Sequence, residues 1–121
     1  YGDVAAIAGL HIMETPTQNL TETLTGLGAT GADLMLCHIG ERPLQAHPMI
    51  PLLQFSSDAE IIARYGRDLD ISLEGSGDTD SQVNRLCDWV ARTASADYQP
   101  KLFSRGITEF QLTRGVLGLS M

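Results

Sequence analysis

The sequence predicts an α/β fold, in the form of a three-layer α/β/α domain with a mainly parallel sheet. Short apolar runs alternate along the chain with segments of helical periodicity, and short loops join them. The runs at 34–37 and 50–55 are apolar except for Gln54, which is typical of strands covered on both faces. A chain of 121 residues can bury one core, so we expect one domain over 1–121.

The first half of the chain is expected to form a strand, a helix and a second strand. A long polar connection over residues 38–49, called the crossing below, then leads to a third strand. The first expected strand, residues 9–13, is ended by Pro16, which cannot continue a central ladder. Thr17 is the expected N-cap of the next helix, and Gly28 its left-handed end. The apolar face of that helix is Leu20, Leu24 and Leu27. We expect the strands at 10–13, 34–37 and 52–55 to be parallel neighbours.

The second half adds two helices and an edge strand. Ser56 or Ser57 caps a helix over 58–65, and residues 69–73 alternate as an edge-like strand. Asp78 or Thr79 caps the longest helix, whose predicted inward stripe is Val83, Leu86, Cys87, Val90, Ala91 and Ala94. The expected final strand or packed coil contains Phe110, Leu112, Val116 and Leu117.

Composition excludes several classes of partner. The net charge is −7 and Lys101 is the only lysine, which argues against nucleic acid and against anionic membrane surfaces. No apolar run approaches the roughly 20 residues that span a bilayer, and no signal peptide is evident. We expect the two cysteines, Cys37 and Cys87, to be free thiols in the core of a cytoplasmic protein, and not to form a disulfide. The start at Tyr1 suggests a fragment of a longer chain.

Candidate chemistry gathers in the crossing after residue 37. His38 stands directly past a strand, where open α/β sheets place ligands, although a structural role fits equally well. No histidine pair has metal-ligand spacing. We expect His11 to be a satisfied core or edge residue and His47 to face solvent. The crossing itself is too polar to be core.

Charged side chains offer further candidates, each with a plain alternative. Arg42 could grip a carboxylate with two nitrogens, or pair with Glu41 in water. Glu14 and Asp70 could act as general bases or hold a cation. Alternatively, Glu14 serves as a helix-cap partner and Asp70 lies on a solvated edge. The Gly75–Gly77 stretch reads as a plain turn, because it lacks the ending of a phosphate loop.

Residues 9–16 of the chain read G-L-H-I-M-E-T-P. This stretch resembles the G-L-x-x-M-D-T-P segment of the altronate/galactarate dehydratase family of sugar-acid dehydratases, which lies in the C-terminal part of those enzymes. The resemblance continues through Gly31–Leu34, Gly40, Pro51, Asp68–Ile71 and Glu109–Phe110, and covers nearly the whole chain. Where the family has T-T-G-R-G this chain has residues 38–42, HIGER, and Gln54 stands at a family lysine.

The resemblance implies a hydro-lyase that converts a hexonic or hexaric acid, such as altronate or galactarate, into a 2-keto-3-deoxy acid. It also implies a divalent metal (iron, manganese or magnesium) that acts as a Lewis acid, with no ligands assigned in this chain. The implied partners are the sugar acid, the remainder of the dehydratase chain and a second copy in a homodimer. The competing hypotheses are a non-catalytic stabilising or dimerisation domain and a small-acid-binding domain.

These strands place one set of residues at the carboxyl edge of the sheet. We expect Glu14, Thr15, His38, Gly40 and Arg42 to converge there, because each follows a predicted strand. His38 and Glu14 are the catalytic candidates, with His38 the proton carrier because imidazoles titrate near neutrality. Thr15, Gly40 and Arg42 are the substrate-binding candidates.

Overall fold

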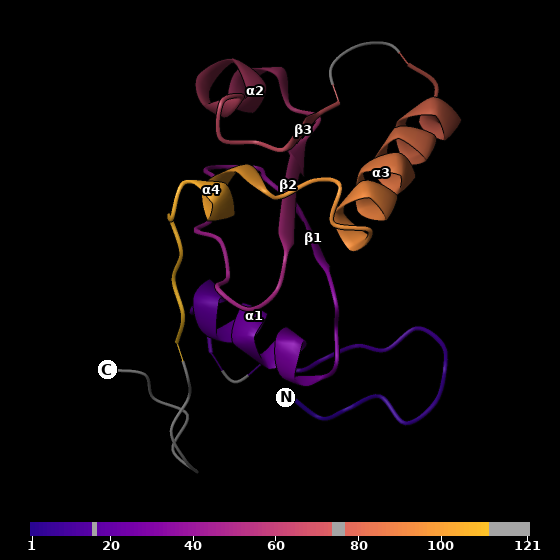
Figure 1. The fold of residues 1–121 in the computed structure, drawn as a ribbon, viewed down its shortest axis with the longest axis vertical. Helices are drawn as coiled ribbons and strands as arrows, with labels where there is room; N and C mark the ends of the chain where they lie inside the picture. The colour runs from indigo at the N-terminus through magenta and orange to yellow at the C-terminus, as the bar shows by residue number, and fades with distance from the viewer. Residues whose placement is uncertain (16, 74–76, 112–121) are drawn as a thin grey trace.

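The computed structural model describes residues 1–15, 17–73 and 77–111. The elements in chain order are α1 (Leu20–Ala29), β1 (Met35–His38), β2 (Leu52–Ser56), α2 (Ala59–Tyr65), β3 (Ile71–Ser72), α3 (Thr79–Ala94) and α4 (Lys101–Ser104) (Figure 1). The strands form a parallel sheet in the order β1-β2-β3. The chain is therefore a small α/β domain with a parallel sheet, as the sequence predicts; the three-layer arrangement stays a prediction.

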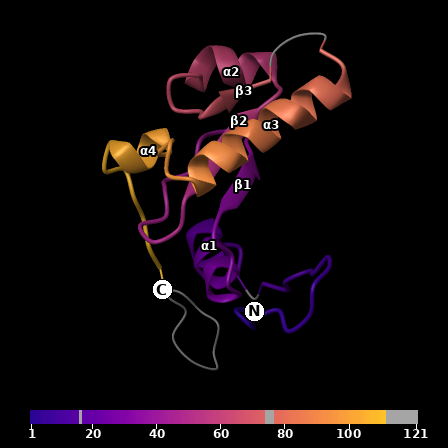
Figure 2. The ribbon, with the colours of Figure 1, turned by 45° about the vertical axis from the view of Figure 1, so that its right-hand side comes forward.

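The parallel strands give the sheet two distinct ends. β1 pairs with β2 from Met35 opposite Leu52 to His38 opposite Phe55, so this predicted pair of neighbours is confirmed. β2 leads into α2, and α2 returns the chain to β3 as a second parallel strand. In Figure 1, α1 lies at the lower, amino end of the strands and α2 at the upper, carboxyl end. Figure 2 shows α3 running obliquely across the view of the strands.

Two small apolar clusters hold helices against this sheet. In the first, Leu24 of α1 packs with Met35 of β1 and Leu52 of β2. In the second, Ile62 of α2 packs with Ile39 and Leu69. Cys37 and Leu44 contact both clusters and join them into a continuous apolar region.

The expected first strand is wrong. Residues 9–13 pair with no strand among the described residues, and Leu10 and Ile12 are 95% and 93% exposed. Alternation predicts a strand only if an edge accepts it. Here Gly9 has a φ of +139°, and the His11 Nε2 lies 2.8 Å from the Ile7 carbonyl oxygen, which folds the segment on itself. His11 is thus an exposed residue and not a core or edge one.

The helix ends differ in detail from the prediction. Asn19 caps α1 in place of Thr17, accepting from the Glu22 N–H at 3.2 Å. Gly28 lies within α1, and the left-handed residue is Gly31, with a φ of +95°. Asp58 is the N-cap of α2, and its carboxylate accepts from the backbone N–H groups of Glu60 and Ile61, which the preceding serines were expected to satisfy. The Asp78 cap of α3 is as predicted.

The crossing between β1 and β2 is partly core, which corrects the expectation of a wholly exposed segment. Ile39 and Ala46 are buried, and His47 is 1% exposed where the sequence suggested a solvent-facing residue. His47 is enclosed because its ring contacts Thr25 Oγ1 at 3.3 Å and stacks edge-on with Phe110. The crossing therefore folds back over α1 instead of standing in water.

The α3 stripe is less buried than its periodicity suggested. Val83 is 48% exposed and Cys87 is also exposed, while Thr93 near the end of α3 is buried. Neither cysteine forms a disulfide; Cys37 is half-buried, and burial raises the pKa of its thiol. In the tail, Thr108 forms a parallel bridge with Ala46.

Some predicted features lie outside the described residues. These are the turn at 75–76 and the tail residues Leu112, Val116 and Leu117. Within the described part of the chain, no helix has the length and apolar character that crossing a bilayer requires.

Candidate functional site

The carboxyl ends of β1 and β2 bring a histidine beside a hydroxyl group. His38 is the last residue of β1 and Ser57 follows β2 directly, so parallel pairing places them together. The His38 Nε2 lies 3.4 Å from the Ser57 Oγ, and both residues are exposed. The His38 ring also stacks edge-on with Phe55, with centroids 5.2 Å apart. This edge therefore presents an imidazole for proton transfer and a hydroxyl for an oxygen-rich ligand.

The turn after β1 leads away from this pair. Gly40 is exposed, and a side chain there would meet no heavy atom within 4 Å. Arg42 is exposed and lines a polar hollow of about 390 Å³ with Asn19 and Glu109. No ion pair between Glu41 and Arg42 occurs in the described structure, so the predicted surface pair is absent from it.

Glu14 and Thr15 lie at the other end of the molecule. Glu14 lines a hollow of about 560 Å³ together with Leu27 and Thr30 near the end of α1. The Thr15 hydroxyl lies 3.1 Å from the Thr23 Oγ1 on α1. In this conformation neither residue joins His38, because the strand expected to carry them to the carboxyl edge does not form.

Asp70 is a buried structural carboxylate and not a residue of a solvated edge. It is 6% exposed, and its Oδ2 accepts the Gln54 N–H at 2.8 Å. Its Oδ1 accepts the Tyr98 hydroxyl at 2.7 Å and the Lys101 N–H at 2.8 Å. The carboxylate thus joins the central strand to the start of α4. Burial and the hydrogen bond to Asp70 raise the pKa of Tyr98 well above its ordinary value.

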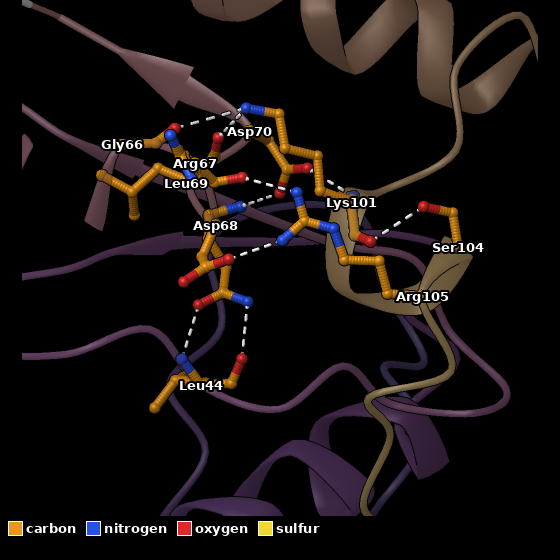
Figure 3. Close-up of polar contacts among 10 residues, drawn as sticks. Leu44, Gly66, Arg67, Asp68, Leu69, Asp70, Lys101, Ser104 and Arg105 are labelled. Atoms are coloured by element: carbon orange, nitrogen blue, oxygen red, sulfur yellow. Dashed lines mark hydrogen bonds and ion pairs between the residues drawn. The ribbon is translucent and has the colours of Figure 1, made fainter.

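A second set of contacts fastens α4 to the loop before β3 (Figure 3). The Lys101 ammonium donates to the carbonyl oxygens of Leu69 and Gly66. Arg105 forms an ion pair with Asp68 at 2.6 Å and donates to the Arg67 carbonyl oxygen at 3.0 Å. Sequence reasoning missed this role, although the position of Lys101, directly after a proline, was a usable signal for a helix start.

The remaining polar groups of the crossing are also structural. Gln54 accepts the Leu44 N–H at 2.7 Å and donates to the Leu44 carbonyl oxygen at 2.8 Å (Figure 3). His47 accepts at Nδ1 from the Met49 N–H at 3.3 Å, and burial lowers the pKa of its ring. Neither side chain is free to bind a ligand without giving up these contacts.

An apolar hollow lies apart from all the predicted site residues. It has a volume of about 490 Å³, and its lining residues come from the crossing, the end of α3 and the start of α4. Met49, Ile50, Tyr98 and Phe103 are among its walls. Because the Tyr98 hydroxyl is bound to Asp70, the hollow offers a ligand mainly apolar contacts.

Metal-binding side chains are not gathered in the described residues. Across 1–15, 17–73 and 77–111, no group of three or more histidine, cysteine, aspartate or glutamate side chains is placed to hold an ion. The site therefore consists of the His38–Ser57 pair, with Arg42 as a nearby residue in sequence that lines a separate hollow. Comparisons with family models, with curated proteins and with solved structures found no match.

Proposed function

We propose that this chain is the C-terminal domain of a sugar-acid dehydratase acting on a hexonic or hexaric acid such as altronate or galactarate. The order of the family-like segments from residue 9 to residue 110 supports the assignment. The observation that carries the site is the contact of His38 with Ser57 at the carboxyl edge of the parallel sheet. Ligands of open α/β sheets bind at that edge.

The reaction removes water in two proton transfers. A base takes the proton beside the carboxylate, and an acid protonates the departing β-hydroxyl, which leaves as water. The enol that remains gains a proton at C3 and loses its hydroxyl proton to give the 2-keto-3-deoxy acid. His38 is suited to carry one of these protons, and the Ser57 hydroxyl to hold a sugar oxygen. The Arg42 guanidinium is the candidate for the substrate carboxylate, which it can grip with two nitrogens.

The donors present do not fit a divalent metal. Because the described residues bring no three candidate ligands together, we assign none of the ligands of an iron, manganese or magnesium ion to them. The proposal places that ion in the remainder of the dehydratase chain. The isolated domain should then bind a sugar acid without dehydrating it.

A non-catalytic stabilising domain is the second candidate. Asp68 and Asp70 lie in one of the segments that resemble the family. Both contact α4 or the residues on either side of it. Their retention is therefore explained by folding alone. Binding of a sugar acid distinguishes the two candidates.

The remaining parts of the proposal concern partners and location. We infer a sugar acid, the rest of the dehydratase chain and a second copy as partners, with no nucleic acid and no membrane, since the net charge is −7. We infer a cytoplasmic location, because Cys37 and Cys87 are free.

The test is an NMR titration of the 121-residue chain with galactarate while the histidine ring signals are followed. Galactitol, which has the same carbon chain without carboxylates, is the matched ligand control. We expect shifts at His38 with galactarate only, and loss of binding in Arg42→Ala but not in Arg85→Ala, an exposed arginine of α3. If His38 does not respond and Arg42→Ala changes nothing, the stabilising role is the correct one.

A further inference from the structure

The outer edge of β1 pairs with no other strand among the described residues. The Met35 N–H donates to the Pro51 carbonyl oxygen at 2.9 Å, and the Ile39 N–H donates to that of Phe55 at 2.7 Å. Backbone groups of a strand alternate between its two sides. Those of Leu36 and His38 therefore point away from β2, where the described residues offer only the Cys37 thiol, 3.8 Å from the His38 oxygen. Leu36 is also 45% exposed.

Residues 9–13 are strand-like in sequence but lack a strand's partners. Leu10 and Ile12 alternate with other residues and are almost fully exposed, which is costly for apolar side chains. Among the described residues, no backbone–backbone hydrogen bond involves any residue from 1 to 15. Residues 1–15 are held by side-chain contacts instead, such as the hydrogen bond that the Tyr1 hydroxyl donates to the Glu22 carbonyl oxygen. An exposed strand sequence and an open edge thus occur in one molecule.

We propose that residues 9–13 add to the outer edge of β1 as a parallel strand, and that this closure carries Glu14 and Thr15 to the carboxyl edge beside His38. The strand, α1 and β1 would then form one βαβ unit, the connection that parallel strands require. α1 already contacts the start of β1, since Leu24 packs with Met35. The role of the closed site rests on the proposed function; the closure itself does not.

The strand comes from the same copy. The six residues from 14 to 19 and the ten of α1 separate the segment from the turn before β1, which is a normal length for such a crossover. A tethered segment reaches the edge at a high effective concentration, whereas a second copy must first associate. The intramolecular arrangement is therefore favoured at ordinary protein concentrations.

Because of this closure, the complete site forms mainly when a ligand is bound. In this structure the Glu14 carboxylate and the Thr15 hydroxyl are near α1, whereas His38 and Ser57 lie together at the carboxyl edge. In the closed form a carboxylate stands beside the imidazole, which supplies a second proton-transfer group. A sugar acid that contacts both elements binds the closed form better and so shifts the population towards it.

Amide hydrogen exchange of the 121-residue chain tests the closure. We expect galactarate to slow exchange of the Leu36 and His38 amides at least tenfold, because backbone carbonyls of the added strand then accept them. Ile12→Pro, which removes a strand N–H, should abolish that protection. Val4→Pro, at an exposed apolar position outside residues 9–13, should keep it.

Saturation-transfer NMR of the free chain separates this inference from the proposed function. A minor state with strand-like shifts at residues 9–13 establishes closure even if galactarate does not bind, and then only the dehydratase proposal is wrong. If galactarate shifts the His38 ring signals but does not protect the Leu36 amide from exchange, the closure is wrong and the proposed function stands. Protection that appears only with dimer formation overturns the same-copy assignment.

Discussion

Replacing Asp70 with asparagine should destabilise the domain more than any other single-atom change at the α4 junction. The carboxylate accepts three hydrogen bonds, from Gln54, Tyr98 and Lys101, while it is 6% exposed. Asparagine keeps one oxygen and turns an N–H₂ group towards donors on the other side. At least one buried donor therefore loses its acceptor.

The magnitude follows from the kind of bond removed. Hydrogen bonds to charged groups contribute about 1.5–3 kcal/mol, and an unsatisfied buried donor costs about 1–3 kcal/mol. Asp70→Asn should accordingly lower the free energy of unfolding by about 2–4 kcal/mol, out of the roughly 5–15 kcal/mol typical of small domains. Tyr98→Phe removes one of the three hydrogen bonds to this carboxylate and should cost about 1.5–3 kcal/mol.

Urea unfolding followed by tryptophan fluorescence is the assay. Trp89 is the only tryptophan and its ring lies edge-on to Tyr98, with centroids 4.5 Å apart, so it reports on this junction. Asp68→Asn is the matched control, since its ion pair is exposed and should contribute under about 1 kcal/mol. An Asp70→Asn variant no less stable than Asp68→Asn would refute the reasoning.

Three further predictions concern the pH dependence of stability, the backbone conformation at Gly31 and the catalytic turnover of the purified chain. Burial lowers the pKa of His47, so the unfolded chain binds a proton that the folded chain resists, and stability should fall as the pH drops below about 6.5. His47→Gln should flatten that slope in urea midpoints measured at several pH values, whereas His11→Gln at an exposed site should not. Gly31→Ala forces a side chain to a φ of +95° and should lower the free energy of unfolding by about 1 kcal/mol, while Gly40→Ala should be nearly neutral. The purified chain with added iron, manganese or magnesium should form no 2-keto-3-deoxy acid from altronate or galactarate, and measurable product would contradict this.

Local patterns predicted the elements whose partners lie nearby in sequence. The apolar runs gave β1 and β2 to within two residues at each end, and Asp78 marked the start of α3. These features depend on burial and on one capping bond, both of which a short stretch of sequence encodes. The parallel pairing of β1 with β2 followed from the same runs.

Features that depend on distant partners were not predictable. Residues 9–13 have the alternation of a strand, but alternation does not say whether an edge is occupied. His47 looked like a loop residue because nothing local indicates that Thr25 and Phe110 enclose it. Asp70 looked solvated because its donors include Tyr98 and Lys101, about thirty residues further along the chain.

For the candidate site, the sequence placed His38 at the carboxyl edge but not its companion. Ser57 was considered only as a helix cap, although its position directly after β2 carried the needed information. Glu14 and Thr15 were assigned to the same edge through a strand that this conformation lacks. The residue types indicate which side chains can take part in proton transfer or binding, whereas the strand topology determines which of them lie together.

The Gln54 side chain behaves as an extra peptide unit inserted between β2 and the crossing. Its amide both accepts from and donates to the backbone of Leu44, as one strand residue does to another. A lysine, which only donates, could not satisfy the Leu44 N–H. The crossing is therefore fastened to β2 through both backbone groups of Leu44, and a lysine at position 54 would keep only the hydrogen bond to the Leu44 carbonyl oxygen.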